Sequence, residues 1–278
     1  MNITGYLLPL LFCLVIILIL LKPYILPRII WSYWHSEEIP ELQKNILAKR
    51  KAILPTFEHI VVSDKTIAKY ISTPFPKNYD QLIKQHKADW VRLELIKAYG
   101  GCWMDVGIII NSATAFETIY NDTLQTCSSF TGFYLDRYII NNDPSTFVEN
   151  WFIMAPKNSS IIDAWLKEFT KAITIGFDKY RNLVEKPYSF ENFYTIHGIY
   201  LTQHVSFQVI IRNMLLRPFI ILYRAEDTMY LLKVKCNWSS ECIMKTIRDD
   251  PTIKTSIPFI KLTSGETSVP IDISSYFK

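Results

Sequence analysis

A short stretch of the chain, residues 88–110, contains three charged side chains whose types and spacing suit ligand binding. Asp89 and Arg92 are one helical turn apart and share a helix face, and Asp105 follows a short apolar segment. The planar fork of an arginine can hold a phosphate through two hydrogen bonds, and carboxylates bind sugar hydroxyls or hard divalent cations. The three residues therefore indicate an anion-binding site, although Asp89 and Arg92 alone also fit an ordinary surface ion pair.

Two glycines and a short strand are predicted to position these charges. The helical pattern stops at Gly100 and Gly101, and the apolar strand that follows ends at Asp105, with Gly107 just beyond it. A buried strand that ends in a carboxylate beside a flexible glycine is a common way for an α/β protein to present an acid to a ligand.

The surrounding pattern alternates strands and helices. Strands are predicted at residues 28–34, 57–63 and 102–111, and helices at 38–54, 64–71 and 80–99. Farther along, strands are predicted at 124–133, 147–155 and 218–223, and helices at 158–173 and 198–216. Strands that alternate with helices in this way form a mostly parallel sheet covered on both faces, so we expect an α/β fold.

The N-terminal segment is strongly apolar. Residues 3–21 carry no charge and are long enough to cross a bilayer as a helix, and no small-residue cleavage site follows them. We therefore expect residues 1–24 to be a single-pass membrane anchor, with a cleaved signal peptide as the alternative, and residues 25–278 to form one catalytic domain.

The membrane orientation and the compartment stay open. Lys22 and Arg28 follow the apolar segment, which disfavours a luminal domain. Three N-glycosylation sequons, at Asn121, Asn158 and Asn237, favour the opposite arrangement, in which a eukaryotic type II protein faces the lumen of the Golgi or the endoplasmic reticulum.

The composition argues against nucleic acid as a partner. The chain has 30 basic and 26 acidic residues, a formal net charge of +4, and no basic cluster. The four cysteines outside the apolar segment permit two disulfides, and Cys236 and Cys242 are close enough to close a short loop, but all four could equally be reduced thiols. Their spacing is not that of a zinc site.

The central motif and its flanking segments have a known counterpart. The pattern D-x-x-R-x-x-x-x-x-x-Y-G-G-x-W-x-D runs without a gap from Asp89 to Asp105. Residues 26–34, LPRIIWSYW, residues 150–156, NWFIMAP, and residues 258–263, PFIKLT, stand in the same order. The chain resembles nucleotide-sugar glycosyltransferases with a DXD motif, which include capsular polysaccharide synthesis proteins, yeast Golgi mannosyltransferases and large clostridial toxins. The resemblance covers about residues 26–265.

This resemblance implies a GT-A type, Rossmann-like nucleotide-sugar-binding domain. It implies transfer of a hexose from a UDP- or GDP-linked donor to a glycan or glycoconjugate acceptor, with retention of the anomeric configuration. Asp105, as the first acid of the DXD motif, and Arg92 would be the catalytic residues, with Asp105 also a metal ligand. The implied donor-binding residues are Trp31 or Trp34, stacked on the base, together with Asp89, Arg92, Gly100, Gly101 and Asp105.

One position departs from the motif. Gly107 replaces the second acid of DXD, so the two-carboxylate grip on Mn²⁺ or Mg²⁺ is lost and the need for a divalent cation is open. His197 or His204 could compensate as a late ligand or lie near the acceptor, although each also fits a structural role. The departure leaves a catalytically degenerate binding or scaffold protein as the alternative. An unrelated hydrolase is disfavoured, because the chain has no G-x-S-x-G, Walker A or H-E-x-x-H motif.

Overall fold

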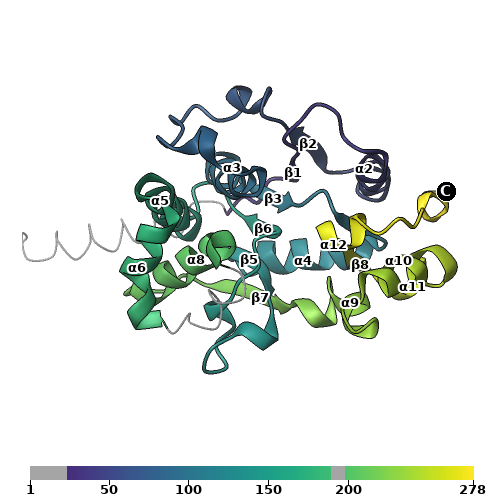
Figure 1. The fold of residues 1–278 in the computed structure, drawn as a ribbon. Helices are drawn as coiled ribbons and strands as arrows, with labels where there is room; N and C mark the ends of the chain where they lie inside the picture. The colour runs from purple at the N-terminus through teal and green to yellow at the C-terminus, as the bar shows by residue number, and fades with distance from the viewer. Residues whose placement is uncertain (1–23, 189–197) are drawn as a thin grey trace, which may run out of the picture.

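The computed structural model describes residues 24–188 and 198–278 (Figure 1). The predicted membrane segment, residues 3–21, and the candidate ligand His197 lie outside these ranges. Among the helices that are described, none combines the length and the apolar character that crossing a bilayer requires.

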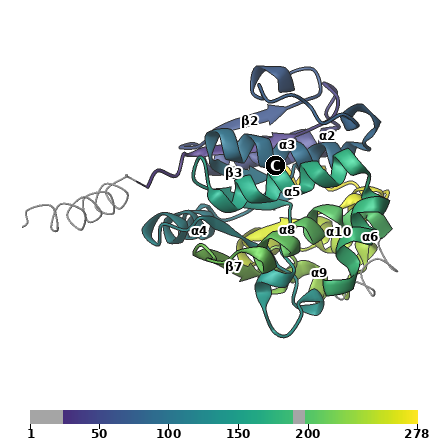
Figure 2. The ribbon, with the colours of Figure 1, turned by 90° about the vertical axis from the view of Figure 1, so that its left-hand side faces the viewer.

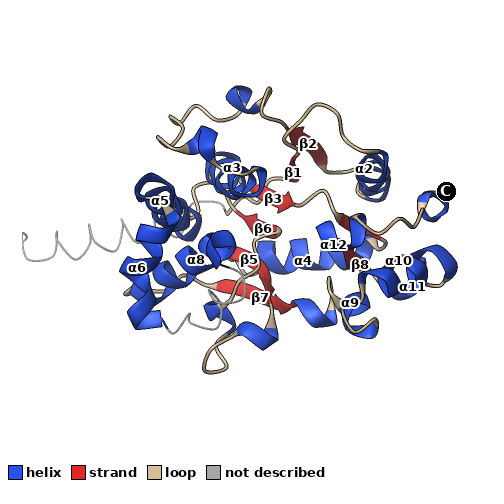
Figure 3. Cartoon of the chain, viewed as in Figure 1, coloured by secondary structure: helices blue, strands red, loops and turns tan. Residues whose placement is uncertain are grey.

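The centre of the molecule is a mixed sheet of six strands in the order β2-β1-β3-β6-β5-β7 (Figure 3). Strand β6 is antiparallel to both of its neighbours, β3 and β5, while the other pairings are parallel. The sheet is therefore mostly parallel, as predicted. Its strands are β1 Ile29–Tyr33, β2 Glu58–Val62, β3 Gly101–Met104, β5 Phe130–Tyr134, β6 Phe152–Ala155 and β7 Ile220–Arg224.

Alternating side chains along these strands fill two cores, one on each face of the sheet. Trp31 and Trp103 point into the core beneath α3 and α5, which cross in front of the strands in Figure 2. Ile30 and Cys102, their chain neighbours, enter the opposite core together with α4. Both faces are thus covered, as a mostly parallel sheet requires. The covering helices are α3 Lys84–Tyr99, α4 Ala113–Gln125, α5 Ser160–Ile175, α6 Phe177–Tyr188 and α8 Thr202–Asn213.

A second, two-stranded sheet pairs β4 Ile108–Ile110 with β8 Phe259–Lys261, in antiparallel orientation. It packs against α2 Glu41–Ile53 and the C-terminal helices in a third apolar cluster. The segment after β7 thus folds back to the end of β3 (Figure 1). The C-terminal helices are α9 Leu231–Lys235, α10 Ser240–Asp249, α11 Ile253–Ser256 and α12 Ser264–Thr267.

Several predicted elements need correction. The single strand expected at 102–111 is two strands, β3 and β4, which belong to different sheets. The helix expected at 64–71 is only a 3-10 turn, Ile67–Lys69, and the strand expected at 124–133 begins at Phe130 because α4 continues to Gln125. Helix α8 occupies part of the predicted 198–216 and is preceded by a 3-10 turn, Gly198–Leu201. Local apolar patterns do not show where such an element starts or breaks.

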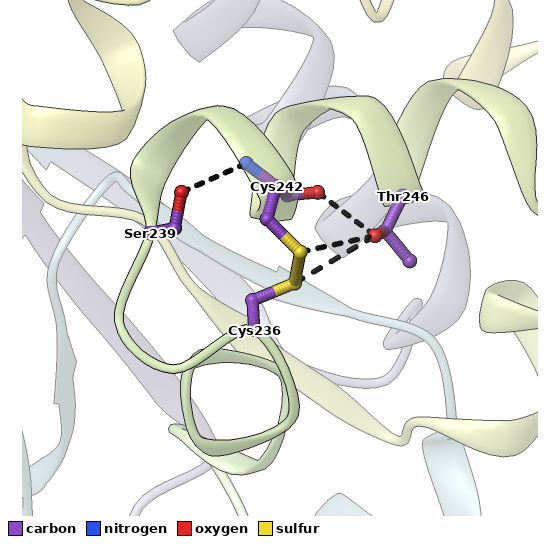
Figure 4. Close-up of a disulfide and its surroundings, with 4 residues drawn as sticks. All are labelled: Cys236, Ser239, Cys242 and Thr246. Carbon is purple, nitrogen blue, oxygen red and sulfur yellow. Dashed lines mark hydrogen bonds between the residues drawn. A yellow bond between two sulfur atoms is a disulfide. The ribbon is translucent and has the colours of Figure 1, made fainter.

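Cys236 and Cys242 form a disulfide that joins the end of α9 to the first turn of α10 (Figure 4). The remaining described cysteines are free thiols, with Cys102 buried in β3 and Cys127 exposed. The short loop that the spacing of Cys236 and Cys242 permits is therefore closed covalently, whereas a second disulfide within the described residues is not formed.

Candidate functional site

A cavity of about 730 Å³ opens at the edge of the sheet where β1 and β3 end and β6 begins. Its volume lies in the range of small-molecule sites. Ligands of open α/β sheets bind outside the carboxyl ends of the parallel strands, and this cavity has that position. The polar and aromatic residues that line it include Trp34, Asp89, Arg92, Asp105, Glu149, Asn150, His204, Lys233 and Lys261.

Asp89 and Arg92 form a buried ion pair on α3, not a surface pair. Arg92 Nη1 lies 3.0 Å from Asp89 Oδ1, and the side chains of Arg92 and Asp89 are only 5% and 7% exposed. Asn150 Nδ2 donates to the same carboxylate oxygen at 3.0 Å, and His86 Nδ1 lies 3.1 Å from Oδ2. Gln203 accepts from Arg92 at 3.1 Å. The pair is therefore held by α3 itself, by the segment before β6 and by α8.

Asp105 is the most accessible carboxylate of this network, with 28% of its side chain exposed. Trp103 Nε1 donates to Oδ1 at 3.0 Å, and Lys261 Nζ donates to Oδ2 at 3.1 Å. Arg92 Nη2 approaches Oδ1 at 3.5 Å. Burial alone would raise the pKa of Asp105, but the charges of Lys261 and Arg92, with the hydrogen bonds from Lys261 and Trp103, hold it below its ordinary value. Asp105 is thus an anion at neutral pH.

Arg50 fixes the backbone that carries Asp105. This fully buried side chain of α2 donates to the carbonyl oxygens of Asp105 at 2.8 Å and Ile108 at 3.1 Å, and to Ser32 Oγ at 2.9 Å. Burial lowers the pKa of Arg50 to about 10, so it remains a cation at neutral pH. The turn between β3 and β4 is therefore held from beneath.

Gly107 lies where the backbone of the turn meets the chain after β8. The Gly107 carbonyl accepts from Leu262 N at 2.8 Å, and a Cβ built on Gly107 would be 2.5 Å from Leu262 O. Such a contact is far inside van der Waals distance and involves backbone that cannot easily move. A carboxylate side chain thus does not fit at this position while β4 and β8 remain paired.

The side chains that contact Asp105 present N–H groups, and these do not fit a divalent cation held by the protein. Mn²⁺ and Mg²⁺ prefer several oxygen ligands, and the second motif acid is absent. Across residues 24–188 and 198–278, no group of three or more His, Cys, Asp or Glu side chains is arranged to hold a metal ion. The charged groups that contact Asp105 in the described structure are instead cations: the ammonium of Lys261, 3.1 Å from Oδ2, and the guanidinium of Arg92, 3.5 Å from Oδ1.

We expect Gly107→Ala to lower the free energy of unfolding by about 1–3 kcal/mol, the usual range for an overpacked site. Denaturant unfolding monitored by circular dichroism would measure it. Gly265→Ala is a matched control, because a Cβ at position 265 would approach only the Ser240 hydroxyl, at 3.0 Å, and the more distant Thr263 hydroxyl. Equal stability of Gly107→Ala and the parent protein would show that this turn tolerates a side chain.

The two candidate stacking tryptophans have different positions. Trp34 is partly exposed and lines the cavity, with its Nε1 donating to the Glu38 carbonyl at 3.2 Å. Trp31 is 1% exposed and packs against Tyr70 and Tyr99 in the core. Its Nε1 donates to the Gly100 carbonyl at 3.0 Å. Trp31 is therefore a core residue, and only Trp34 is placed to meet a ligand.

Gly100 and Gly101 shape the chain but do not line the cavity. Their φ angles are +72° and +93°, and a Cβ on Gly100 would be 2.5 Å from Lys157 N. Glycine is required here because the chain turns sharply from α3 into β3 under a closely packed backbone. The family resemblance implies that Gly100 and Gly101 contact the nucleotide-sugar donor, but their position outside the cavity does not agree with that expectation.

His204 faces the cavity from the first turn of α8. Its Nε2 lies 3.5 Å from Glu149 Oε2, and its ring stacks on Phe147 with a centroid separation of 5.1 Å. Both His204 and Glu149 are buried. His204 is not placed among the groups that contact Asp105 in the structure.

Several residues that build the site were not predicted from the sequence. Arg50 is four residues after the buried Ile46, so its place on the buried face of α2 was readable from the helical period. Gln203 had no such signal, and Lys261 was part of the recognised segment 258–263, but only the folded chain shows that these side chains contact Arg92 and Asp105. Asn150 was part of a recognised segment, but its contact with Asp89 was not predictable.

Comparison with known proteins gives relatives of one class. The chain is 27% identical over 164 residues to the O-glycosyltransferase PaGT of Phomopsis amygdali, a match that covers 53% of this chain and 39% of that protein. It is 30% identical over 92 residues to inositol phosphoceramide mannosyltransferase 3 of Schizosaccharomyces pombe, a match that covers 31% of this chain and 25% of that protein. Both matches thus span well under half of the relatives' length.

Solved structures show a weaker likeness. A glycosyltransferase involved in the glycosylation of the major capsid of PBCV-1 aligns over 87% of this chain and 96% of its own, with 12% identity and a TM-score of 0.44. The PaToxG glycosyltransferase aligns over 64% of this chain and 78% of its own, with 14% identity and a TM-score of 0.39.

The family comparison covers most of the described chain. Residues 22–237 match the model of the capsular polysaccharide synthesis protein family. The match includes the α3–β3 core with Asp89, Arg92 and Asp105, and it confirms the resemblance that these residues carry. The chain therefore belongs to the capsular polysaccharide synthesis protein family.

Proposed function

We propose that the protein is a glycosyltransferase with a GT-A type fold, anchored to a membrane through residues 1–24. It transfers a hexose from a nucleotide-diphosphate sugar to a hydroxyl of a glycan or glycoconjugate. The observation that carries the proposal is the buried chain of charges from Asp89 through Arg92 to Asp105, which ends at a cavity on the carboxyl edge of the sheet. The glycosyltransferase relatives support the same reaction class.

The residues divide into those that meet the donor and those that position them. Asp105 is the more accessible acid of the cavity, and we assign the hexose side of the donor to Asp105 and the base to Trp34, whose partly exposed ring can stack. Arg92 and Asp89 are largely occupied by each other and by Gln203 and Asn150. Their main task is therefore to hold the orientation and charge of Asp105.

The proposed hexose transfer involves no oxidation or reduction. The bond between the hexose C1 and the diphosphate oxygen breaks, and its electron pair leaves with the nucleoside diphosphate. A bond from C1 to the acceptor oxygen forms, and the acceptor proton is released to solvent. We propose retention of the anomeric configuration, which the coupling constant of the product's anomeric proton would report.

A degenerate binding protein is the second candidate, and Gly107 is the observation that favours it. Such a protein would bind a nucleotide sugar in the same cavity without transferring the hexose. Binding without turnover, in the presence of every acceptor tried, would support this alternative over the enzyme.

The test is a screen of UDP- and GDP-hexoses with the full chain in detergent. We expect release of nucleoside diphosphate from one donor, by slow hydrolysis or by transfer to an added glycan, because water can replace the acceptor hydroxyl. A coupled assay would measure the release, and isothermal titration would measure binding. Absence of both binding and turnover with every donor, from protein shown to be folded, would contradict the proposed function.

A further inference from the structure

The ammonium of Lys261 lies beside the Oδ2 atom of Asp105. Strand β8 places it there, because the pairing of β4 with β8 sets Lys261 opposite Ile108. Its Nζ is 3.1 Å from Asp105 Oδ2 and 3.7 Å from the point where a Cβ of Gly107 would stand. The ammonium therefore lies within reach of both motif positions, although no motif residue supplies it.

The same backbone pairing that delivers Lys261 also excludes a second acid. A Cβ on Gly107 would be 2.5 Å from the carbonyl oxygen of Leu262, the residue directly after Lys261. It is thus the backbone after β8, and not the Lys261 side chain, that excludes a carboxylate at Gly107. Lys261 also lies beyond residues 22–237, which match the family model.

Lys261 has hydrogen-bonding capacity left for a ligand. An ammonium has three N–H donors, and in the described structure one donates to Asp105 and one to the Leu262 carbonyl, each at 3.1 Å. The side chain lines the cavity yet is only 9% exposed. A cation in such a partly desolvated place interacts more strongly with an anion than one in bulk water.

A second buried lysine of the cavity shows the contrast. Lys233 lies 2.5 Å from Glu266, a carboxylate that also accepts from the backbone and the hydroxyl of Thr263. Lys233 therefore has a carboxylate of its own. The charge of Asp105 is instead shared between Lys261 and Arg92, which leaves Lys261 less fully neutralised.

We propose that Lys261 is the built-in cation that binds the donor's diphosphate, so that donor binding and hexose transfer need no divalent metal ion. The inference rests on the proposed function. As the bond from C1 to the diphosphate oxygen breaks, negative charge grows on the leaving nucleoside diphosphate, and the free N–H of Lys261 stabilises it. Stabilisation of a developing charge by a fixed donor is a large contribution to catalysis.

The experiment asks whether binding and turnover depend on a metal ion or on Lys261, using the full chain in detergent. UDP and GDP binding is titrated, and turnover of the accepted donor is measured, with excess EDTA and separately with Mn²⁺. For the unaltered protein we expect the same Kd and the same turnover in both conditions. For Lys261→Met we expect turnover to fall about 100-fold, as for the loss of one transition-state donor, and diphosphate binding to weaken while uridine or guanosine binding is unchanged.

Two further variants separate charge from folding. Lys261→Arg keeps the cation and is expected to retain more turnover than Lys261→Met. Lys245→Met removes a lysine of α10 that is 53% exposed, and it is the matched control expected to behave like the parent. Melting curves show whether each variant is folded, and the EDTA comparison on the unaltered protein needs no variant at all.

The outcomes distinguish this inference from the proposed function. Turnover that requires Mn²⁺ and stops in EDTA would overturn the role of Lys261 while leaving the glycosyltransferase intact. The same is true if folded Lys261→Met keeps the parent's turnover. If no nucleotide sugar is bound or turned over under any condition, it is the proposed function that fails.

Discussion

Replacing Arg92 with methionine is expected to lower the free energy of unfolding by about 3–5 kcal/mol, because it leaves a buried carboxylate without its charged partner. Asp89 would keep its contacts with His86 and Asn150 but lose the guanidinium at 3.0 Å. We expect turnover to be lost as well, since Asp105 and Gln203 each lose a contact with Arg92. Denaturant unfolding and the turnover assay measure the two effects.

The lysine variant separates charge from geometry at this position. Arg92→Lys keeps the positive charge but cannot reach Asp89, Gln203 and Asp105 at once, so we expect turnover to fall more than stability. Arg248→Met is the matched control, because that arginine is 42% exposed and pairs only with its neighbour Asp249 in the described structure. A fully stable Arg92→Met protein would show that the ion pair is not needed to hold α3 in place.

Replacing Asp105 with asparagine is expected to cut turnover by about 100- to 1000-fold, the range seen when one electrostatic group of an active site is removed. Asparagine has nearly the same shape, but it cannot supply the charge that Arg92 and Lys261 face. Steady-state kinetics with saturating donor measures the loss. The effect on the Kd for the nucleoside diphosphate is expected to be smaller. Asparagine disturbs the site, but it also removes a negative charge that repels the diphosphate, and the second effect offsets part of the first.

The difference in stability between the parent and the Asp105→Asn variant should depend on pH. The folded-state pKa of Asp105 is below its ordinary value of 3.8, so its ion pairs stabilise the protein above that pH and lose their effect as the pH falls through the folded-state pKa. The parent should therefore exceed Asp105→Asn in stability at neutral pH, with the gap closing in acid. Asp227→Asn, at a carboxylate that is 65% exposed, is the control. A pH-independent gap would contradict the ion-pair assignment.

The core of the fold was predictable because its signals are local. The first strand, predicted at 28–34, the helix that stops at Gly100 and the start of the strand after Gly101 follow from apolar runs and glycine stops within a few residues. The break between β3 and β4 was not predictable. Residues 102–111 read as one apolar run, and only the pairing of β4 with the distant β8 removes its second half from the main sheet.

Only the part of the site that lies in one continuous segment of the sequence was predictable. Asp89, Arg92 and Asp105 were identifiable because they share one continuous segment, and the structure brings them into contact. Trp34 and Trp31 were both candidates for stacking on a base, and the pleat of β1 turns Trp31 into the core while Trp34 lies past the strand end. Lys261 is separated from Asp105 by 156 residues, so no local pattern could assign it to the same site.

That separation also decides when the site comes into existence. During synthesis, strands β1 and β3 leave the ribosome long before Lys261 does. Asp105, with its partners Trp103 and Arg92, leaves with them. Closing so long a loop costs conformational entropy, and contacts of large sequence separation form late in folding. A partly made chain would thus have the acid and the aromatic plate of the cavity but not the ammonium. If Lys261 binds the donor's diphosphate as proposed, the complete donor site is therefore assembled only after the main sheet has formed.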